Sequence, residues 1–127
     1  MKHSSILAVV SVLFHNVLGS GFGHTCHNIN LDSWKHDGLD HYYLKADCVE
    51  CDGARDSHVQ LDLGGCIANR NGQMVPAQGG AFWRSCGFCW LSGVNLTCSC
   101  RNSAGQAVLT QINLNDFIGN HCGILHC

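Results

Sequence analysis

The chain lacks the features of several common classes of protein. Only 13% of its 127 residues are charged, and the formal net charge of −2 gives no basic surface for nucleic acid. Its apolar stretch at residues 6–14 is shorter than the roughly 20 residues that span a bilayer, and no amphipathic basic helix suggests membrane binding. Neither CxxC motif is followed at zinc-finger spacing by a histidine pair, helical periodicity is weak, and Pro76 is the single proline. We therefore expect neither nucleic acid nor a membrane as partner, and a fold built from strands.

The N-terminus is typical of a secretory signal. Lys2 precedes the apolar stretch, and small residues follow it at Gly19 and Gly21. We predict a signal peptide over residues 1–19, with cleavage after Gly21 as the alternative, and a secreted, extracellular protein.

Cysteine is abundant, since all ten cysteines follow the predicted signal. Exported thiols normally oxidise, so an even number of them predicts five disulfides. Zinc is the alternative, because residues 48–51 and 86–89 have ligand-like CxxC spacing. We favour disulfides and expect no metal and no cofactor. Ten cysteines allow about 945 pairings, so counting alone leaves the pattern open.

One phrase occurs twice in the chain. Residues 60–72 (QLDLGGCIANRNG) and 111–123 (QINLNDFIGNHCG) share five identical residues at identical spacing. They divide the chain into repeats at about 26–75 and 82–127, which predicts a pseudo-symmetric all-β protein. Paired surfaces indicate binding more than catalysis. His24, Asp32 and Ser33 form no catalytic constellation, so we expect no enzyme. The shared residues are Gln60/Gln111, Leu63/Leu114, Ile67/Ile118, Asn69/Asn120 and Gly72/Gly123.

Local patterns place strands and turns within each repeat. Apolar–polar alternation at 59–63 and 108–114 predicts half-buried strands. Short helical turns should follow at 64–67 and 115–118, the second capped by the Asn115 side chain. Residues 74–81, rich in glycine, predict a linker and hinge that would permit a domain-swapped dimer.

These motifs resemble the cyanovirin-N homology family. The resemblance rests on residues 83–86 (WRSC), 96–100 (LTCSC) and 112–123, with matching segments in the first repeat. It is strongest to secreted fungal members. It implies an elongated, disulfide-stapled fold over residues 24–127, with two halves that each combine a triple-stranded sheet and a hairpin from both repeats. It also implies metal-free, lectin-like binding of mannose-rich glycans, and disulfides Cys26–Cys48 and Cys86–Cys100.

The resemblance also implies one sugar site in each half. Amide, guanidinium and hydroxyl groups suit a neutral polyol, because they donate and accept hydrogen bonds to vicinal hydroxyls. Asn69 is expected to act mainly as a turn residue, whereas Asn71 and Asn102 are better ligand candidates. Site B comprises Asn69, Arg70, Asn71, Arg84, Ser85, Arg101, Asn102 and Ser103; site A comprises Thr25, Glu50, Asn120 and His121.

Site A departs from the family pattern. Cys51 and Cys122 stand where ligands belong, on segments that are neighbours in the family fold, so we expect a Cys51–Cys122 disulfide that closes this site. Cys89 and Cys98 flank a predicted hairpin at Ser92-Gly93 and are a plausible pair. Elimination then leaves Cys66 with Cys127.

Three further features qualify this interpretation. Residues 36–43 exceed what a simple hairpin needs and predict an extended loop near site A. Asn95 begins an N-glycosylation sequon. Finally, loss of site A allows a rival to the lectin: a secreted effector or extracellular interaction protein on a scaffold that no longer binds sugar. The expected partners are otherwise oligosaccharides or glycoproteins, bound by a monomer or a swapped dimer.

Overall fold

The computed structural model describes residues 20–127, so the predicted signal peptide lies outside the described residues. Two three-stranded antiparallel sheets dominate it. The first has the order β1 (Cys26–His36), β2 (Leu39–Val49), β3 (Asp56–Asp62), and the second β6 (Cys86–Ser92), β7 (Asn95–Arg101), β8 (Ala107–Asn113). The strands expected from alternation at 59–63 and 108–114 are confirmed as parts of β3 and β8, except that each strand ends one residue earlier than expected. None of the helical segments in residues 20–127 has the length and apolar character to cross a membrane.

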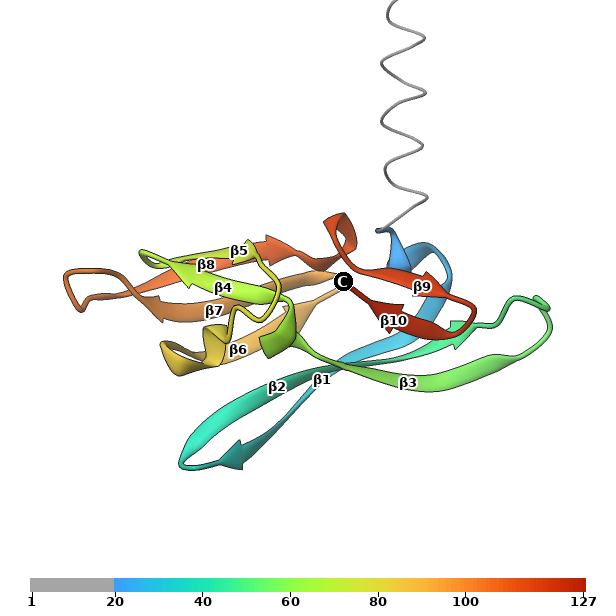
Figure 1. Ribbon diagram of the computed structural model, residues 1–127, viewed down its shortest axis with the longest axis horizontal. Helices are drawn as coiled ribbons and strands as arrows, with labels where there is room; N and C mark the ends of the chain where they lie inside the picture. The colour runs from blue at the N-terminus through green and yellow to red at the C-terminus, as the bar shows by residue number, and fades with distance from the viewer. Residues whose placement is uncertain (1–19) are drawn as a thin grey trace, which may run out of the picture.

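Two short hairpins complete the fold by exchange between the repeats. Hairpin β4 (Ile67–Arg70) and β5 (Gln73–Pro76) packs beside β8, whereas β9 (Gly119–His121) and β10 (Ile124–His126) pack beside β3 (Figure 1). Half A therefore consists of β1–β3 with β9–β10, and half B of β4–β8. Each half takes strands from both repeats, as the resemblance implied, and the molecule is elongated, with the β1–β2 hairpin of half A extending alongside half B (Figure 1).

The core explains why the repeated phrase is apolar where it is. Leu63, Ile67, Leu114 and Ile118, the apolar residues that recur, are all fully buried. Two further pairs, Phe22/Phe82 and Leu44/Leu96, join them from equivalent positions of the two repeats. Burying each such side chain contributes roughly 1.5–3 kcal/mol. Phe22 also shows that the packed structure begins before residue 24, the expected start.

Four 3₁₀ turns precede strands: η1 (Phe22–His24), η2 (Leu63–Gly65), η3 (Phe82–Arg84) and η4 (Leu114–Asp116). The expected Asn115 cap is wrong. Asn113 caps η4, because its side chain accepts a hydrogen bond from the Asn115 N–H, and Asp62 caps η2 in the same way. The Asn115 side chain instead accepts from the Gly23 N–H at 2.7 Å and joins η4 to η1.

The linker between the repeats is shorter than predicted. Residues 74–76 belong to β5, which leaves 77–81 as the connection. Its amides are anchored, since Ala77 donates to the Cys66 carbonyl at 2.8 Å and Ala81 to the Gly64 carbonyl at 2.8 Å. All ten cysteines are paired, in the five pairs expected: Cys26–Cys48, Cys51–Cys122, Cys66–Cys127, Cys86–Cys100 and Cys89–Cys98.

The extra residues at 36–43 form no loop near site A, so that expectation is wrong. They lengthen the β1–β2 hairpin, with Leu31 to His36 paired against Leu44 to Leu39. Trp34 stacks on Tyr43 at 4.1 Å between ring centroids and stiffens the extension. His41 lies 4.1 Å from Trp83, centroid to centroid, so the extension reaches half B instead. Cross-strand aromatic pairing favours strand over loop here.

Candidate functional site

An asparagine clamp organises each of the two sites. In site B the Asn69 amide donates to the Ser85 hydroxyl and to the Arg101 carbonyl, both at 2.8 Å, and accepts from the Gly72 N–H at 2.8 Å. In site A, Asn120 makes the equivalent bonds to Thr25, Val49 and Gly123 at 3.0, 3.0 and 2.8 Å. Each clamp ties a hairpin turn to both strands of a disulfide-linked pair. Most of the hydrogen-bonding groups of these two asparagine side chains are therefore engaged within the protein.

The hairpin turns beside the clamps have matching geometry. Asn71 and Cys122 have φ values of 53° and 54°, followed by Gly72 and Gly123 at 87° and 86°. This left-handed pair is the type I′ geometry that asparagine and glycine favour. A Cβ at Gly72 would lie 2.7 Å from Val108 Cγ2, so the turn also packs closely on β8.

In site B a hydrogen bond links the turn to the facing loop. The Ser103 N–H donates to Asn71 Oδ1 at 2.8 Å. Asn102 stabilises its own loop, accepting from the Ala104 and Gln106 N–H groups at 3.0 and 2.9 Å. The Asn71 amide N–H₂ and the Ser103 hydroxyl have no partner among residues 20–127, and both residues are exposed. Site B thus presents donors and acceptors on an open surface.

Arginines surround this surface. Arg70, Arg84 and Arg101 are all exposed. The Arg84 guanidinium lies over the Trp83 ring, 5.4 Å from its centroid, an arrangement that orients the cation. The structure thus brings together all eight residues assigned to site B, of which Asn69, Ser85 and Asn102 are half-buried and the other five are exposed.

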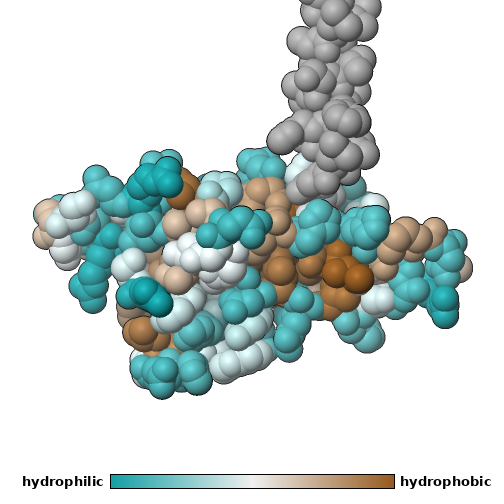
Figure 2. Space-filling view, in the orientation of Figure 1, coloured by the Kyte–Doolittle hydropathy of each residue, from teal (hydrophilic) through white to brown (hydrophobic). Residues whose placement is uncertain are grey.

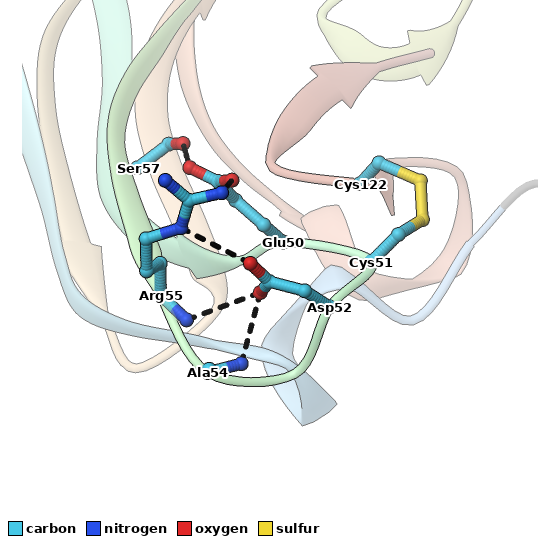
Figure 3. Close-up of polar contacts among 7 residues, drawn as sticks. All are labelled: Glu50, Cys51, Asp52, Ala54, Arg55, Ser57 and Cys122. Carbon is cyan, nitrogen blue, oxygen red and sulfur yellow. Dashed lines mark hydrogen bonds and ion pairs between the residues drawn. A yellow bond between two sulfur atoms is a disulfide. The ribbon is translucent and has the colours of Figure 1, made fainter.

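Site A has the same framework, with a disulfide where site B has the Asn71–Ser103 hydrogen bond. The Cys51–Cys122 disulfide joins the turn and the loop of half A that are equivalent to the facing turn and loop of site B (Figure 3). Glu50, the expected ligand, accepts from the Ser57 hydroxyl at 2.6 Å and lies 3.8 Å from the Arg55 guanidinium. His121 is exposed at the end of β9. Site A therefore has few polar groups left for a ligand.

In the loop beside the disulfide, the charges of Asp52 and Arg55 pair with each other. Asp52 accepts from the Ala54 and Arg55 N–H groups at 2.9 and 3.2 Å, and its second oxygen accepts from Arg55 Nε at 3.0 Å (Figure 3). The Ala54 N–H and the Arg55 side chain hold the pKa of the Asp52 carboxyl below its ordinary value. Asp52 is therefore charged and internally satisfied at neutral pH.

One feature beside site B was missed at the sequence level. A groove of about 210 Å³ runs from Arg84, Ser85 and Arg101 to Phe88 and to Leu39 on the β1–β2 hairpin. Figure 2 shows hydrophobic surface near the tip of that hairpin, bordered by hydrophilic atoms. The sequence signal that could have indicated this groove is the run of extra residues at 36–43, which form the hairpin extension.

Two other expectations concern metal and glycan attachment. Within residues 20–127 no group of three or more His, Cys, Asp and Glu side chains is arranged to hold a metal ion. Asn95 is the first residue of β7 and is half-buried, paired with Ser92 and Asn113 across the sheet. Its glycosylation remains a prediction.

Comparison with known proteins identifies the family. The CVNH domain matches residues 22–126, nearly the whole described chain. The chain belongs to the CVNH family. Comparison with curated protein sequences gives no significant match.

Solved CVNH structures share this architecture. Microvirin, solved in complex with mannobiose, is 30% identical, with 84% of this chain and 97% of microvirin covered and a TM-score of 0.63. The CVNH protein of Gibberella zeae is 27% identical, with 84% and 95% covered and a TM-score of 0.67. A MoCVNH3 variant solved with (N-GlcNAc)4 is 22% identical, with 85% and 97% covered and a TM-score of 0.70, which supports the fold alone. The CVNH fold that the family resemblance implied is thus confirmed.

Proposed function

We propose that the protein is a secreted lectin that binds mannose-rich glycans through site B alone. The observation that carries this proposal is the difference between the two sites. At site B the turn and the facing loop are held by the Asn71–Ser103 hydrogen bond, and their side chains stay exposed. At site A the same positions are occupied by a disulfide. Microvirin, a family member solved with mannobiose, supports mannose as the sugar.

The chemistry of site B suits a sugar held without metal. The Asn71 amide, the Ser103 and Ser85 hydroxyls and the arginines offer donors at several angles, as vicinal hydroxyls require. Sugar hydroxyls must give up water before they pair, so one site should bind weakly. Strong attachment then depends on several copies of the protein, or on a densely glycosylated target.

The rival function is an interaction protein that has lost sugar binding. Closure of site A favours it, because one ancestral surface already serves stability. The two proposals differ in what site B does, so the test must close site B without disturbing the fold.

The variant Asn71→Cys/Ser103→Cys does this by copying the site A disulfide, whose Cα atoms lie 4.4 Å apart. We expect wild type to bind oligomannosides with one site per chain in calorimetry, and the oxidised variant to bind none while melting at or above the wild-type temperature. Glu50→Ala in site A is the matched control and should bind as wild type does. Two sites per chain, or no glycan signal for wild type on an array, would contradict the proposal; the second result would favour the rival.

A further inference from the structure

Charge is distributed unequally between the two halves. Residues 67–113, which form half B, contain Arg70, Arg84 and Arg101 and no carboxylate. All nine Asp and Glu residues of the chain lie elsewhere. Three of the four arginines of the protein therefore occupy a half without any acidic side chain, although the protein as a whole is acidic.

The cations of half A are neutralised, and those of half B are not. Lys35, Lys45 and Arg55 each lie within 4 Å of a carboxylate, at 3.1, 2.9 and 3.0 Å. Every ion pair in the described part of the chain falls between residues 27 and 58. Unpaired guanidinium groups clustered on one surface raise the local concentration of anions and can bind carboxylate or phosphate through two parallel hydrogen bonds.

Two of these arginines line the groove that continues site B. Arg84 and Arg101 lie at one end beside Ser85, which is itself part of site B, so the groove and the site share residues. Gly87, Ser99 and Ala107 line the groove with small side chains, while Trp83, Phe88 and Leu39 are its large apolar members. A pocket with apolar walls and a few converging polar groups is the usual form of a small-ligand site.

The same positions in half A carry charged side chains that pair with one another. The strand registers place His27, Asp47 and Asp56 where half B has Gly87, Ser99 and Ala107. His27 Nε2 lies 3.1 Å from Asp56 Oδ2, so an ion pair covers this surface. The cationic groove is thus particular to half B and does not follow from the fold.

Phe88 provides an independent indication that the groove is used. It occupies the left-handed bulge of β6 with φ 51°, and it is 88% exposed. Asn28, its counterpart in β1, has φ 52°. Asparagine adopts this left-handed conformation readily, whereas a bulky aromatic residue adopts it only with backbone strain. A strained and exposed aromatic side chain at the edge of a groove is typical of ligand contact.

We propose that this groove binds an acidic sugar unit next to the sugar held in site B. The exposed ring of Phe88 packs on the pyranose ring, and Arg84 and Arg101 pair with its carboxylate, sulfate or phosphate. This inference rests on the proposed lectin function and narrows its ligands to glycans that carry an anionic substituent.

The test compares matched neutral and anionic ligands by calorimetry at two salt concentrations. The probes are mannobiose, dimannuronate, mannose 6-phosphate, mannose and inorganic phosphate. We expect each acidic sugar to bind wild type about tenfold more tightly than its neutral counterpart, less so at high salt because the charges are exposed. In Arg84→Gln/Arg101→Gln this ratio should fall to about one, whereas Lys45→Gln, which removes a cation from half A, should retain it.

Phe88→Asn separates the ring contact from the charge. It copies the residue at the equivalent bulge, so the protein should fold, and it should weaken dimannuronate binding several-fold.

Equal affinity for mannobiose and dimannuronate would overturn the inference and leave the lectin function intact. Inorganic phosphate that binds as tightly as mannose 6-phosphate would also overturn it, since the sugar would then contribute nothing. Acidic sugars that bind while every neutral probe fails would support the groove and contradict mannose binding at site B. Failure of all the probes would overturn both proposals.

Discussion

The two halves share one framework and differ in what joins the turn to the loop opposite. Asn69 and Asn120 make the same three hydrogen bonds, and the turns beside them have nearly identical dihedral angles. Half B then closes the contact with the Asn71–Ser103 hydrogen bond, and half A with Cys51–Cys122. The framework is therefore independent of the ligand-facing residues. One copy of a repeated surface can become a covalent staple while the other remains open.

The largest expected effect comes from making half A resemble half B. Cys51→Ser/Cys122→Asn replaces the disulfide by the residues at positions 103 and 71. Since the disulfide joins residues separated by 71 positions, chain entropy predicts a loss of about 4 kcal/mol, of which a new hydrogen bond restores about 1 kcal/mol. Chemical denaturation measures this loss. We expect one glycan site per chain to remain, because Glu50 and Asn120 stay engaged within the protein; a second site would show that the disulfide alone blocks site A.

The next effect separates the clamp from the ligand. Asn69→Ala and Asn120→Ala should each destabilise the protein by roughly 2 kcal/mol, because each leaves partly buried donors and acceptors unpaired. Only Asn69→Ala should also weaken glycan binding, since it releases the turn that carries Asn71. Paired denaturation and calorimetry curves check this. Equal binding by both variants would mean that the clamp of half B does not position the site.

A smaller effect concerns the two bulges. Phe88→Asn should stabilise the protein by about 1 kcal/mol, because asparagine tolerates the left-handed conformation that strains phenylalanine. The reciprocal Asn28→Phe should destabilise it, since it adds that strain and removes the 2.8 Å hydrogen bond from Asn28 Nδ2 to Asp47. Thermal unfolding of both variants measures the difference. A stability loss in Phe88→Asn would mean that Phe88 stabilises the fold by packing, and would argue against a role for it in ligand binding.

The fold was predictable from the sequence because the repeated phrase contains its own core. Leu63, Ile67, Leu114 and Ile118 recur at fixed spacing and are fully buried, and the glycines at the end of each copy occupy the left-handed turns. This spacing is visible in the sequence itself, so the buried positions and the turns could be predicted without a structure.

The groove and the hairpin extension were not predictable in the same way. Their positions depend on contacts between segments far apart in sequence, such as His41 with Trp83. The Asn115 error has a related cause: two asparagines two residues apart both satisfy the cap preference, and only the contact with Gly23 decides between them. The eight residues of site B lie together, but only the structure shows that the cations of half A are paired with carboxylates while these arginines are not.

The smallest expected effect is a pH dependence confined to half A. Asp47 on β2 accepts hydrogen bonds from the Asn28 amide and from His58. These two partners, Asn28 first, hold the pKa of Asp47 below its ordinary value. Since the folded state binds the proton less readily than the unfolded state, this contact stabilises the fold above the ordinary aspartate pKa of about 3.9, and the contribution disappears as the pH falls through the lowered value. Asp47→Asn should therefore be less stable than wild type near pH 6 and equal to it in strong acid.

Asp37→Asn, at the 89% exposed hairpin tip, is the control and should follow wild type throughout. A stability gap for Asp47→Asn that persisted unchanged into strong acid would show that the asparagine disturbs packing and not charge.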